Sequence, residues 1–484
     1  MAEQITQQQS LEAFEQQLRQ KVQQGDPVAC FQIVEHFERK GIAPNKLEST
    51  SRINLLMEAS NKGIGAASIL LAHWYLNGHY VQKDAAKAIL FFEHAANVCK
   101  DSYGFYELAK MFELGLGVKA QPEKAQQFLK KAVDLHNPEA TFTYATQRIQ
   151  QEPEHSLQLL KDNYKKHHHV KSLLCLNDAQ EFNQDKVQNF FEANQDDPYI
   201  AGLLAFRYLK NGQLQQAKQL AQQSAQQNNP IGCHVRALVE YQDSDGDAAL
   251  AQQYMLKAAQ LGHNEAAYQA ALVVLQQVDQ ITDSAQKQQL LQQALQLLAQ
   301  AAHAGVASAQ FSLGQCLTQG IGVEVNRQEG FRWIERAAQQ GNVDAIFALA
   351  LNLPVEHEQH LPLLNTAAQA GHPKAMMCMG IYCQNHDQPA EAIEWFTHAK
   401  ARGDIRAGYL LGIAYRDGLG VDADAKLAVE LLNQAGEQGD ADAYFALYES
   451  YKEGIGVRKN KKSQAKYLKL AQTAQHPKAL EIQE

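Results

Sequence analysis

Apolar and small residues recur along the chain at the spacing of a helix. A small residue is followed four positions later by leucine and eight positions later by an aromatic residue, as in Ala407, Leu411 and Tyr415. Residues spaced in this way lie on one face of a helix, and a face of this composition is expected to be buried. The pattern predicts amphipathic helices along the chain and no β-sheet.

The predicted helices come in pairs. The first helix of a pair ends at two glycines, such as Gly418 and Gly420, because glycine adopts the left-handed conformation that closes a helix. The second helix carries alanine and an aromatic residue three positions apart, as in Ala392–Trp395, and ends at another glycine. The next pair often begins with a capping residue and proline, as at Asn137 and Pro138, where proline loses no helical hydrogen bond.

The pairs form internal repeats. The end of the second helix reappears with little change at Lys257–Gly262, Arg336–Gly341 and Thr366–Gly371. We predict about thirteen units over residues 26–475, each of about 35 residues, with a degenerate stretch at 137–261. A capping helix is expected at residues 1–25 and a C-terminal tail at 476–484.

This organisation predicts an all-α fold. Alanine and glycine at the junctions let helices approach closely, and each antiparallel pair leaves an apolar flank that the next pair can cover. The expected result is an α-solenoid superhelix of antiparallel helix pairs, whose stability is the sum of repeat and neighbour-interface terms.

Composition narrows the class of protein further. The 484 residues carry a formal net charge of −9 and are 45% apolar, which argues against disorder and against a dedicated nucleic-acid-binding surface. No apolar run reaches the roughly 18 residues of a membrane span. The seven cysteines are odd in number and mostly isolated, and the N-terminus does not resemble a secretory signal. We therefore expect a cytoplasmic protein without membrane or nucleic-acid partners.

The repeat also matches a known pattern. The sequence A-x-x-x-L-G-x-x-Y-x-x-G-x-G-V, followed by K-A-x-x-W-x-x-K-A-A-x-x-G, resembles the Sel1-like repeat, a relative of the tetratricopeptide repeat. Residues Ala407–Gly439 match nearly position by position, and Ala309–Gly341 match well. The resemblance is strong over about 63–136 and 262–475. It implies a protein–protein interaction scaffold or adaptor, often bacterial, with no shared catalytic residues.

In related solenoids the first helix of each unit lines the concave surface. Two residues after the small residue of this helix lies a column of apolar side chains, whose aromatic members are Tyr106, Phe142, Tyr268, Phe311, Phe347, Tyr409 and Phe445. A groove with an aromatic residue in each repeat could bind an extended or helical peptide. The alternative is an ordinary packing position against the neighbouring helix. If the column is a groove, nearby polar residues would confer selectivity, among them Arg406, Arg416, Glu449 and Lys452.

Other groups of reactive residues have simpler interpretations. The run Lys165–Val170 contains three consecutive histidines, which cannot all face one metal ion from one helix, so we expect a solvated turn. Cys378 and Cys383 fit buried small apolar residues, and the basic run Arg458–Lys462 fits an exposed turn. We expect no catalytic, cofactor-binding or metal-ligating residues.

The sequence thus predicts a non-enzymatic scaffold that binds a protein or peptide on the concave face of the solenoid. It leaves the partner and the oligomeric state open, with a monomer as one option. One alternative is an inhibitor or immunity-type protein that masks a toxin or enzyme. Another is a metal- or small-molecule-binding protein, or an enzyme, that uses the irregular region 137–261.

Overall fold

The computed structural model describes residues 2–39, 49–278 and 281–482. In these residues the chain forms helices and turns and contains no β-strand. Two compact units are distinguished, Met1–Leu204 and Ala205–Glu484, and each is described by itself.

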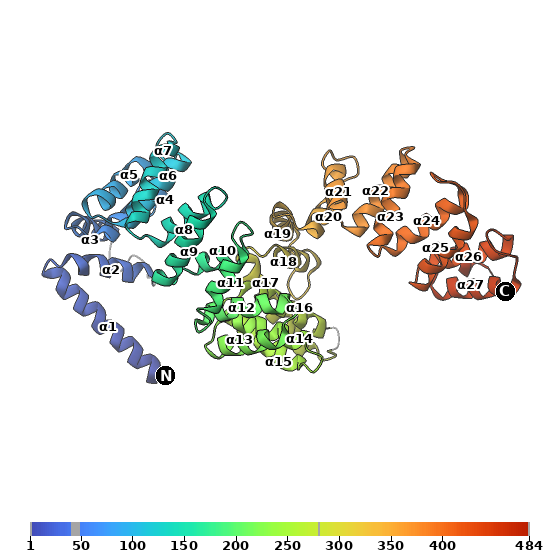
Figure 1. Ribbon diagram of the computed structural model, residues 1–484, viewed down its shortest axis with the longest axis horizontal. Helices are drawn as coiled ribbons and strands as arrows, with labels where there is room; N and C mark the ends of the chain where they lie inside the picture. The colour runs from blue at the N-terminus through green and yellow to red at the C-terminus, as the bar shows by residue number, and fades with distance from the viewer. Residues whose placement is uncertain (1, 40–48, 279–280, 483–484) are drawn as a thin grey trace. The chain divides into compact units, whose positions relative to one another are not determined.

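The helices follow one another as short antiparallel pairs (Figure 1). The first unit contains α1 (Ala2–Gln23), α2 (Pro27–Arg39), α3 (Ser49–Asn61), α4 (Gly65–Asn77), α5 (Ala85–Glu93), the π-helix η2 (His94–Val98), α6 (Ser102–Leu114), α7 (Pro122–Asp134), α8 (Pro138–Arg148), α9 (Pro153–His167), α10 (Val170–Asp178) and α11 (Gln184–Glu192). Helix α12 (Pro198–Lys210) crosses the boundary between the units.

The second unit continues the same alternation. It contains α13 (Leu214–Gln226), α14 (Pro230–Gln242), α15 (Ala248–Gln260), α16 (Asn264–Val278), α17 (Ser284–His303), α18 (Ala307–Gln319), α19 (Arg327–Gln339), α20 (Val343–Asn352), α21 (His360–Gln369), α22 (Pro373–Asn385), α23 (Pro389–Ala401), α24 (Ile405–Asp417), α25 (Ala425–Glu437), α26 (Ala441–Glu453), α27 (Lys461–Thr473) and α28 (Pro477–Leu480).

One pair illustrates how the sequence builds this structure. In α24 the small and apolar residues Ala407 and Leu411 are buried, as their spacing predicts. The helix ends where Gly418 adopts the left-handed conformation with φ of 70°. Asp424 then accepts hydrogen bonds from the first backbone N–H groups of α25 and starts the second helix.

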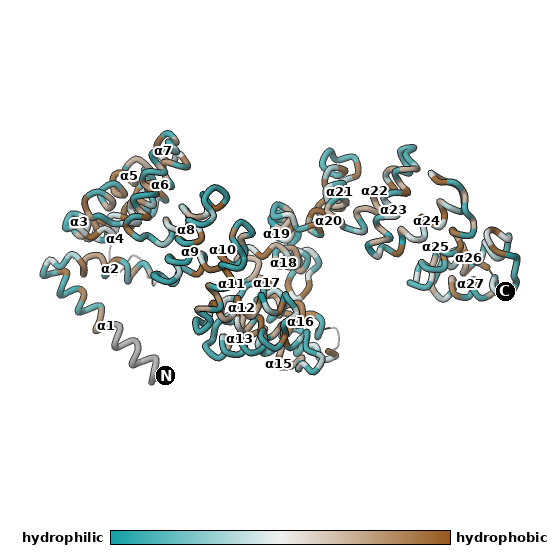
Figure 2. Tube along the Cα trace, viewed as in Figure 1, coloured by the Kyte–Doolittle hydropathy of each residue, from teal (hydrophilic) through white to brown (hydrophobic). Residues whose placement is uncertain are grey.

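Close helix packing depends on residues without a large side chain. Gly412 of α24 lies against Leu432 of α25, where even a Cβ atom would approach the leucine to 2.8 Å. The buried alanines on both helices also allow close packing. Along the helices of each unit, hydrophobic and hydrophilic segments alternate (Figure 2). The fold is therefore an all-α solenoid of paired helices, which confirms the predicted fold class. The number of units stays a prediction.

The two ends of the described chain are also packed. Leu18 of α1 is buried in the apolar core formed with α2, α3 and α4. The segment expected to be a tail begins with the short helix α28, in which Ala479 is fully buried against α26 and α27.

Candidate functional site

The seven aromatic residues of the column lie on the first helices of their pairs: α6, α8, α16, α18, α20, α24 and α26. All seven are half-buried, whereas the small residue two positions earlier is buried in each case. Each ring therefore packs against the neighbouring helices and keeps part of its surface exposed. We call these seven residues the aromatic column.

Three rings of the aromatic column contact a histidine that begins the next first helix. The ring centroids are 5.4 Å apart for Phe142 and His169, 4.2 Å for Phe347 and His372, and 4.3 Å for Phe445 and His476. Each histidine is the N-cap of its helix, and its side chain accepts a hydrogen bond from a backbone N–H three residues later.

A carboxylate completes each of these junctions. The Nε2 atom of His372 lies 3.4 Å from Asp344, and that of His476 lies 3.0 Å from Asp442. A backbone N–H can only donate, so the Nδ1 atom of the capping histidine must accept. A neutral imidazole that accepts at Nδ1 carries its proton on Nε2. The Nε2–H group then donates to the carboxylate. His169 and Glu139 repeat the arrangement at 3.4 Å.

These junctions were not predicted from the sequence. Their signal was an acidic residue three positions before the aromatic residue, followed by a histidine at the start of the next unit. The junction at His169 also corrects the expectation for the histidine run. His169 is not part of a solvated turn, because its side chain is only 10% exposed and packs on Phe142. Of the other two histidines, His167 ends α9 and His168 is the C-cap of that helix.

A fourth junction replaces the phenylalanine with histidine. His234 occupies the column position in α14, and its ring centroid lies 4.3 Å from that of His263, which precedes α16. The Nε2 atom of His234 is 3.0 Å from the side-chain oxygen of Gln269. Burial and the nearby His234 lower the pKa of His263 to about 4, and burial also lowers the pKa of His234.

The polar residues predicted beside the column are largely engaged within the protein. Arg406 forms ion pairs with Asp442 and with Asp440, the latter at 3.4 Å, and its guanidinium lies 4.4 Å from the centre of the Tyr409 ring. Arg416 pairs with Asp417 at 2.7 Å and with Glu449 at 3.6 Å. These contacts hold successive first helices together.

Lys452 makes a different contact. Its ammonium group lies 5.6 Å from the centre of the Tyr448 ring on the same helix. Lys452 therefore packs within α26, whereas Arg406 and Arg416 join α24 to α26.

Two members of the aromatic column line one cavity. Phe311 and Phe347 contribute to a hollow of about 510 Å³ that spans α18, α20 and the start of α22. Leu351 adds exposed apolar surface, and Lys374 and Arg402 add cations. This volume lies within the range of about 300–1,000 Å³ typical of ligand pockets.

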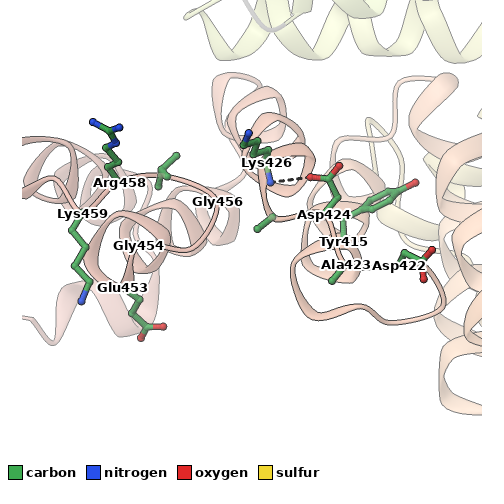
Figure 3. A pocket seen from close by; sticks show the side chains of 12 residues that line it. Tyr415, Asp422, Ala423, Asp424, Lys426, Glu453, Gly454, Gly456, Arg458 and Lys459 are labelled. Atoms are coloured by element: carbon green, nitrogen blue, oxygen red, sulfur yellow. Dashed lines mark hydrogen bonds between the residues drawn. The ribbon is translucent and has the colours of Figure 1, made fainter.

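A larger hollow of about 1,000 Å³ lies between the turns that follow α24 and α26 (Figure 3). Its walls carry charges of both signs, including Asp422, Glu453, Arg458 and Lys459. Asp424 at its edge accepts a hydrogen bond from the backbone N–H of Lys426, 3.0 Å away, which starts α25. The basic run is exposed here, as expected.

The structure also brings together Ser68, His94 and Cys99, a cluster that the sequence did not suggest. The Nδ1 atom of His94 lies 3.2 Å from the Ser68 hydroxyl and 3.7 Å from the Cys99 thiol. Burial raises the pKa of Cys99 and keeps its thiol protonated, so it is a poor nucleophile. Cys383 is buried, as expected, and Cys378 is half-buried.

In the described parts of the chain, His, Cys, Asp and Glu side chains do not gather in groups of three that could hold a metal ion. None of the helices in residues 2–39, 49–278 and 281–482 is both long enough and apolar enough to cross a membrane.

The paired helices, capped junctions and small-residue contacts define an α-solenoid repeat protein. A family model described as the Sel1 repeat matches seven segments, at residues 65–97, 106–137, 241–263, 287–306, 307–342, 373–404 and 406–440. The chain therefore contains seven Sel1 repeats, which confirms the resemblance over these segments. The model matches none of residues 138–240, but it does match 241–263, most of which we also predicted to be degenerate.

Several solved structures are similar to this chain. A protective antigen of uropathogenic Escherichia coli with an SLR fold is 20% identical, with 97% of this chain and 91% of that chain covered and a TM-score of 0.47. A Sel1 repeat protein from Oxalobacter formigenes is 22% identical, with 69% and 88% covered and a TM-score of 0.31. The immunity protein Pa5087 from Pseudomonas aeruginosa is 18% identical, with 37% and 73% covered and a TM-score of 0.29.

Proposed function

We propose that the chain is a non-enzymatic interaction scaffold that binds a protein or peptide along the face formed by its first helices. The observation that carries this proposal is the half-buried state of the aromatic column. Aromatic rings that are held by packing on one side supply contact area at a small cost in conformational entropy. The cavity at Phe311 and Phe347 supports the proposal, because it adds a concave site to this face.

The competing interpretation is that the column only packs neighbouring helices. A position used for packing alone would resemble the small residue two positions earlier, which is fully buried at Ala407 and Ala443. Tyr409 and Phe445 instead remain partly exposed. This difference favours a surface that a partner can complete.

We also propose that the protein acts in the cytoplasm. Its seven cysteines are all free thiols, and Cys378 and Cys383, the closest two in sequence, are not bonded to each other. Unpaired thiols in this number suit a reducing compartment.

The test is affinity capture from the source organism with the wild-type chain and the double variant Tyr409→Ala, Phe445→Ala as baits. We expect the variant to lose several-fold of the captured partner, because contact area is removed, while its melting temperature changes little. Tyr103→Ala is the matched control, since Tyr103 is 45% exposed but lies outside the aromatic column.

Equal capture by all three baits would contradict the proposal, as would a loss of capture fully explained by unfolding of the double variant. A single folded partner that co-purifies in stoichiometric amount would favour the inhibitor form of the proposal over a peptide-binding adaptor.

A further inference from the structure

We propose that the cavity at Phe311 and Phe347 binds an acidic peptide segment, with an apolar side chain between the rings and a neighbouring carboxylate held by Lys374 and Arg402. This inference rests on the proposed function and deepens it, because it names the chemistry of the partner at one place on the face.

The apolar part of the cavity comes from two successive first helices. Phe311 of α18 and Phe347 and Leu351 of α20 line it together. Leu351 is 58% exposed, which leaves a large apolar side chain in contact with water beside two aromatic rings. Covering such a surface is favourable because it removes apolar area from water. An aliphatic or aromatic side chain of a partner would provide this cover.

The two acidic residues of the cavity are already used by the fold. Asp404 accepts a hydrogen bond of 2.8 Å from the backbone N–H of Ala407 and caps α24, where the helix dipole offsets its charge. Asp344 faces the Nε2 atom of His372 at 3.4 Å. Both carboxylates therefore have a partner within the protein.

The two cations of the cavity have no such partner. Lys374 and Arg402 are exposed, and neither forms an ion pair with any residue in the described parts of the chain. Arg402 follows α23 at the junction before α24, and Lys374 lies in the first turn of α22, so both cations belong to the helix pair α22–α23. A carboxylate on the partner could pair with either one.

Together these features favour a peptide over other classes of ligand. A nucleic acid presents many phosphates and would need a long basic surface, whereas here only two free cations adjoin an apolar wall. A peptide with an apolar residue next to aspartate or glutamate presents both required groups within one short segment. The cavity volume of about 510 Å³ is sufficient for a large side chain.

The test measures binding of short fluorescein-labelled peptides of equal length to the full chain by fluorescence anisotropy. One peptide places leucine and phenylalanine among aspartates, a second places them among lysines, and a third keeps the aspartates but replaces the apolar residues with serine. We expect the first peptide to bind at least about tenfold more tightly than either of the others.

Charge reversal then locates the site. The double variant Lys374→Glu, Arg402→Glu should lose about tenfold in affinity for the first peptide and gain affinity for the second. The control Arg327→Glu, Arg332→Glu makes the same change in net charge on α19, outside the cavity, and should leave the affinities unchanged.

Three outcomes would overturn the inference. These are no binding of the first peptide, equal affinity for the first and second peptides, or equal effects of the cavity variant and its control. If peptides of either charge bind equally and Phe311→Ala with Phe347→Ala weakens both, the acidic preference fails while the proposed function stands. If the peptides fail to bind but partner capture still depends on the aromatic column, the inference fails while the proposed function stands.

Discussion

The histidines at the unit junctions each have two structural roles. His372 caps α22 through its Nδ1 atom and packs against Phe347, while its Nε2 proton faces Asp344. Asparagine and aspartate perform only the first role at other junctions, as Asn342 and Asp404 do. A protonated Nδ1 atom could not accept the backbone hydrogen bond, so the cap needs the neutral form of the imidazole.

We predict a pH-dependent loss of stability at the junction of His263. Its pKa is about 4 in the folded chain and 6.5 for the ordinary side chain, so only the unfolded chain takes up this proton between these values. The contribution of His263 to the free energy of unfolding is therefore complete above pH 6.5, and it declines as the pH falls towards 4. Between pH 7 and pH 5 it should decrease by roughly 2 kcal/mol.

The measurement is urea unfolding of wild-type protein and His263→Asn at both pH values. Asparagine caps first helices elsewhere in the chain, as at Asn229 and Asn342, so the variant keeps the cap without the titrating group. Its stability should fall by a smaller amount between pH 7 and pH 5. An identical decrease in both proteins would show that His263 does not contribute.

At the scale of the helix pair, the two glycines of a turn have different roles. Gly454 closes α26 in the left-handed conformation, with φ of 83°. Gly456 also has positive φ, but it lies against the first turn of α25, where a Cβ atom would overlap the carbonyl oxygen of Ala425. The second glycine thus lets the turn of one pair contact the preceding pair.

We predict that Gly456→Ala destabilises the chain by about 3 kcal/mol, from a strained backbone and from overlap with Ala425. Gly439→Ala is the matched control, because Gly439 has φ of 98° but no atom within 4 Å of an added Cβ. The control should lose only about 1 kcal/mol. Thermal unfolding followed by circular dichroism measures both, and equal losses would exclude a packing role for Gly456.

The turn after α14 ends a first helix by other means. After α14 the carboxylate of Glu240 accepts a hydrogen bond of 2.9 Å from the backbone N–H of Asp247 and forms an ion pair with Arg236. Glu240 and Arg236 are both buried, so a charged network stabilises the turn that glycines form elsewhere. Without Arg236, the buried Glu240 would keep only Lys218, 3.9 Å away, and the Asp247 N–H as partners.

At the scale of the whole molecule, stability comes from contacts between adjacent helices. Within each unit the apolar clusters join neighbouring pairs, as the cluster around Phe396 joins α20 through α25. A change in one pair should therefore affect its neighbours most strongly and leave distant pairs intact.

We predict that Trp333→Ala lowers the free energy of unfolding by about 3–5 kcal/mol. The reason is that Trp333 is only 6% exposed and packs in the core of α16, α17 and α18. Hydrogen exchange should become faster in these helices and in α19, with no change in the unit Met1–Leu204. Trp395→Ala is the control at the same repeat position, since Trp395 is half-buried and should lose less. Faster exchange along the whole chain would contradict local unfolding.

Much of the fold could be predicted from the sequence because its determinants are local. Helical spacing, capping residues and glycines act within one or two turns, and their repetition indicates stacking. The aromatic column was predicted for the same reason, since one position recurs in each unit. The cavity at Phe311 and Phe347 was not predicted, because it also needs Arg402 from a later junction and the exposed Leu351.

The amino-acid sequence alone determined the class of this protein, the paired helices and the register of their buried faces, because each follows from neighbours along one helix. Only the tertiary structure decided which charges are free and which are paired. Arg406 and Arg402 look alike in the sequence, yet Arg406 pairs with Asp440 and Asp442 of the next unit, and Arg402 stands beside a cavity without an ion-pair partner in the described chain. Electrostatic pairing depends on distances between units, and these are set only when the helices stack.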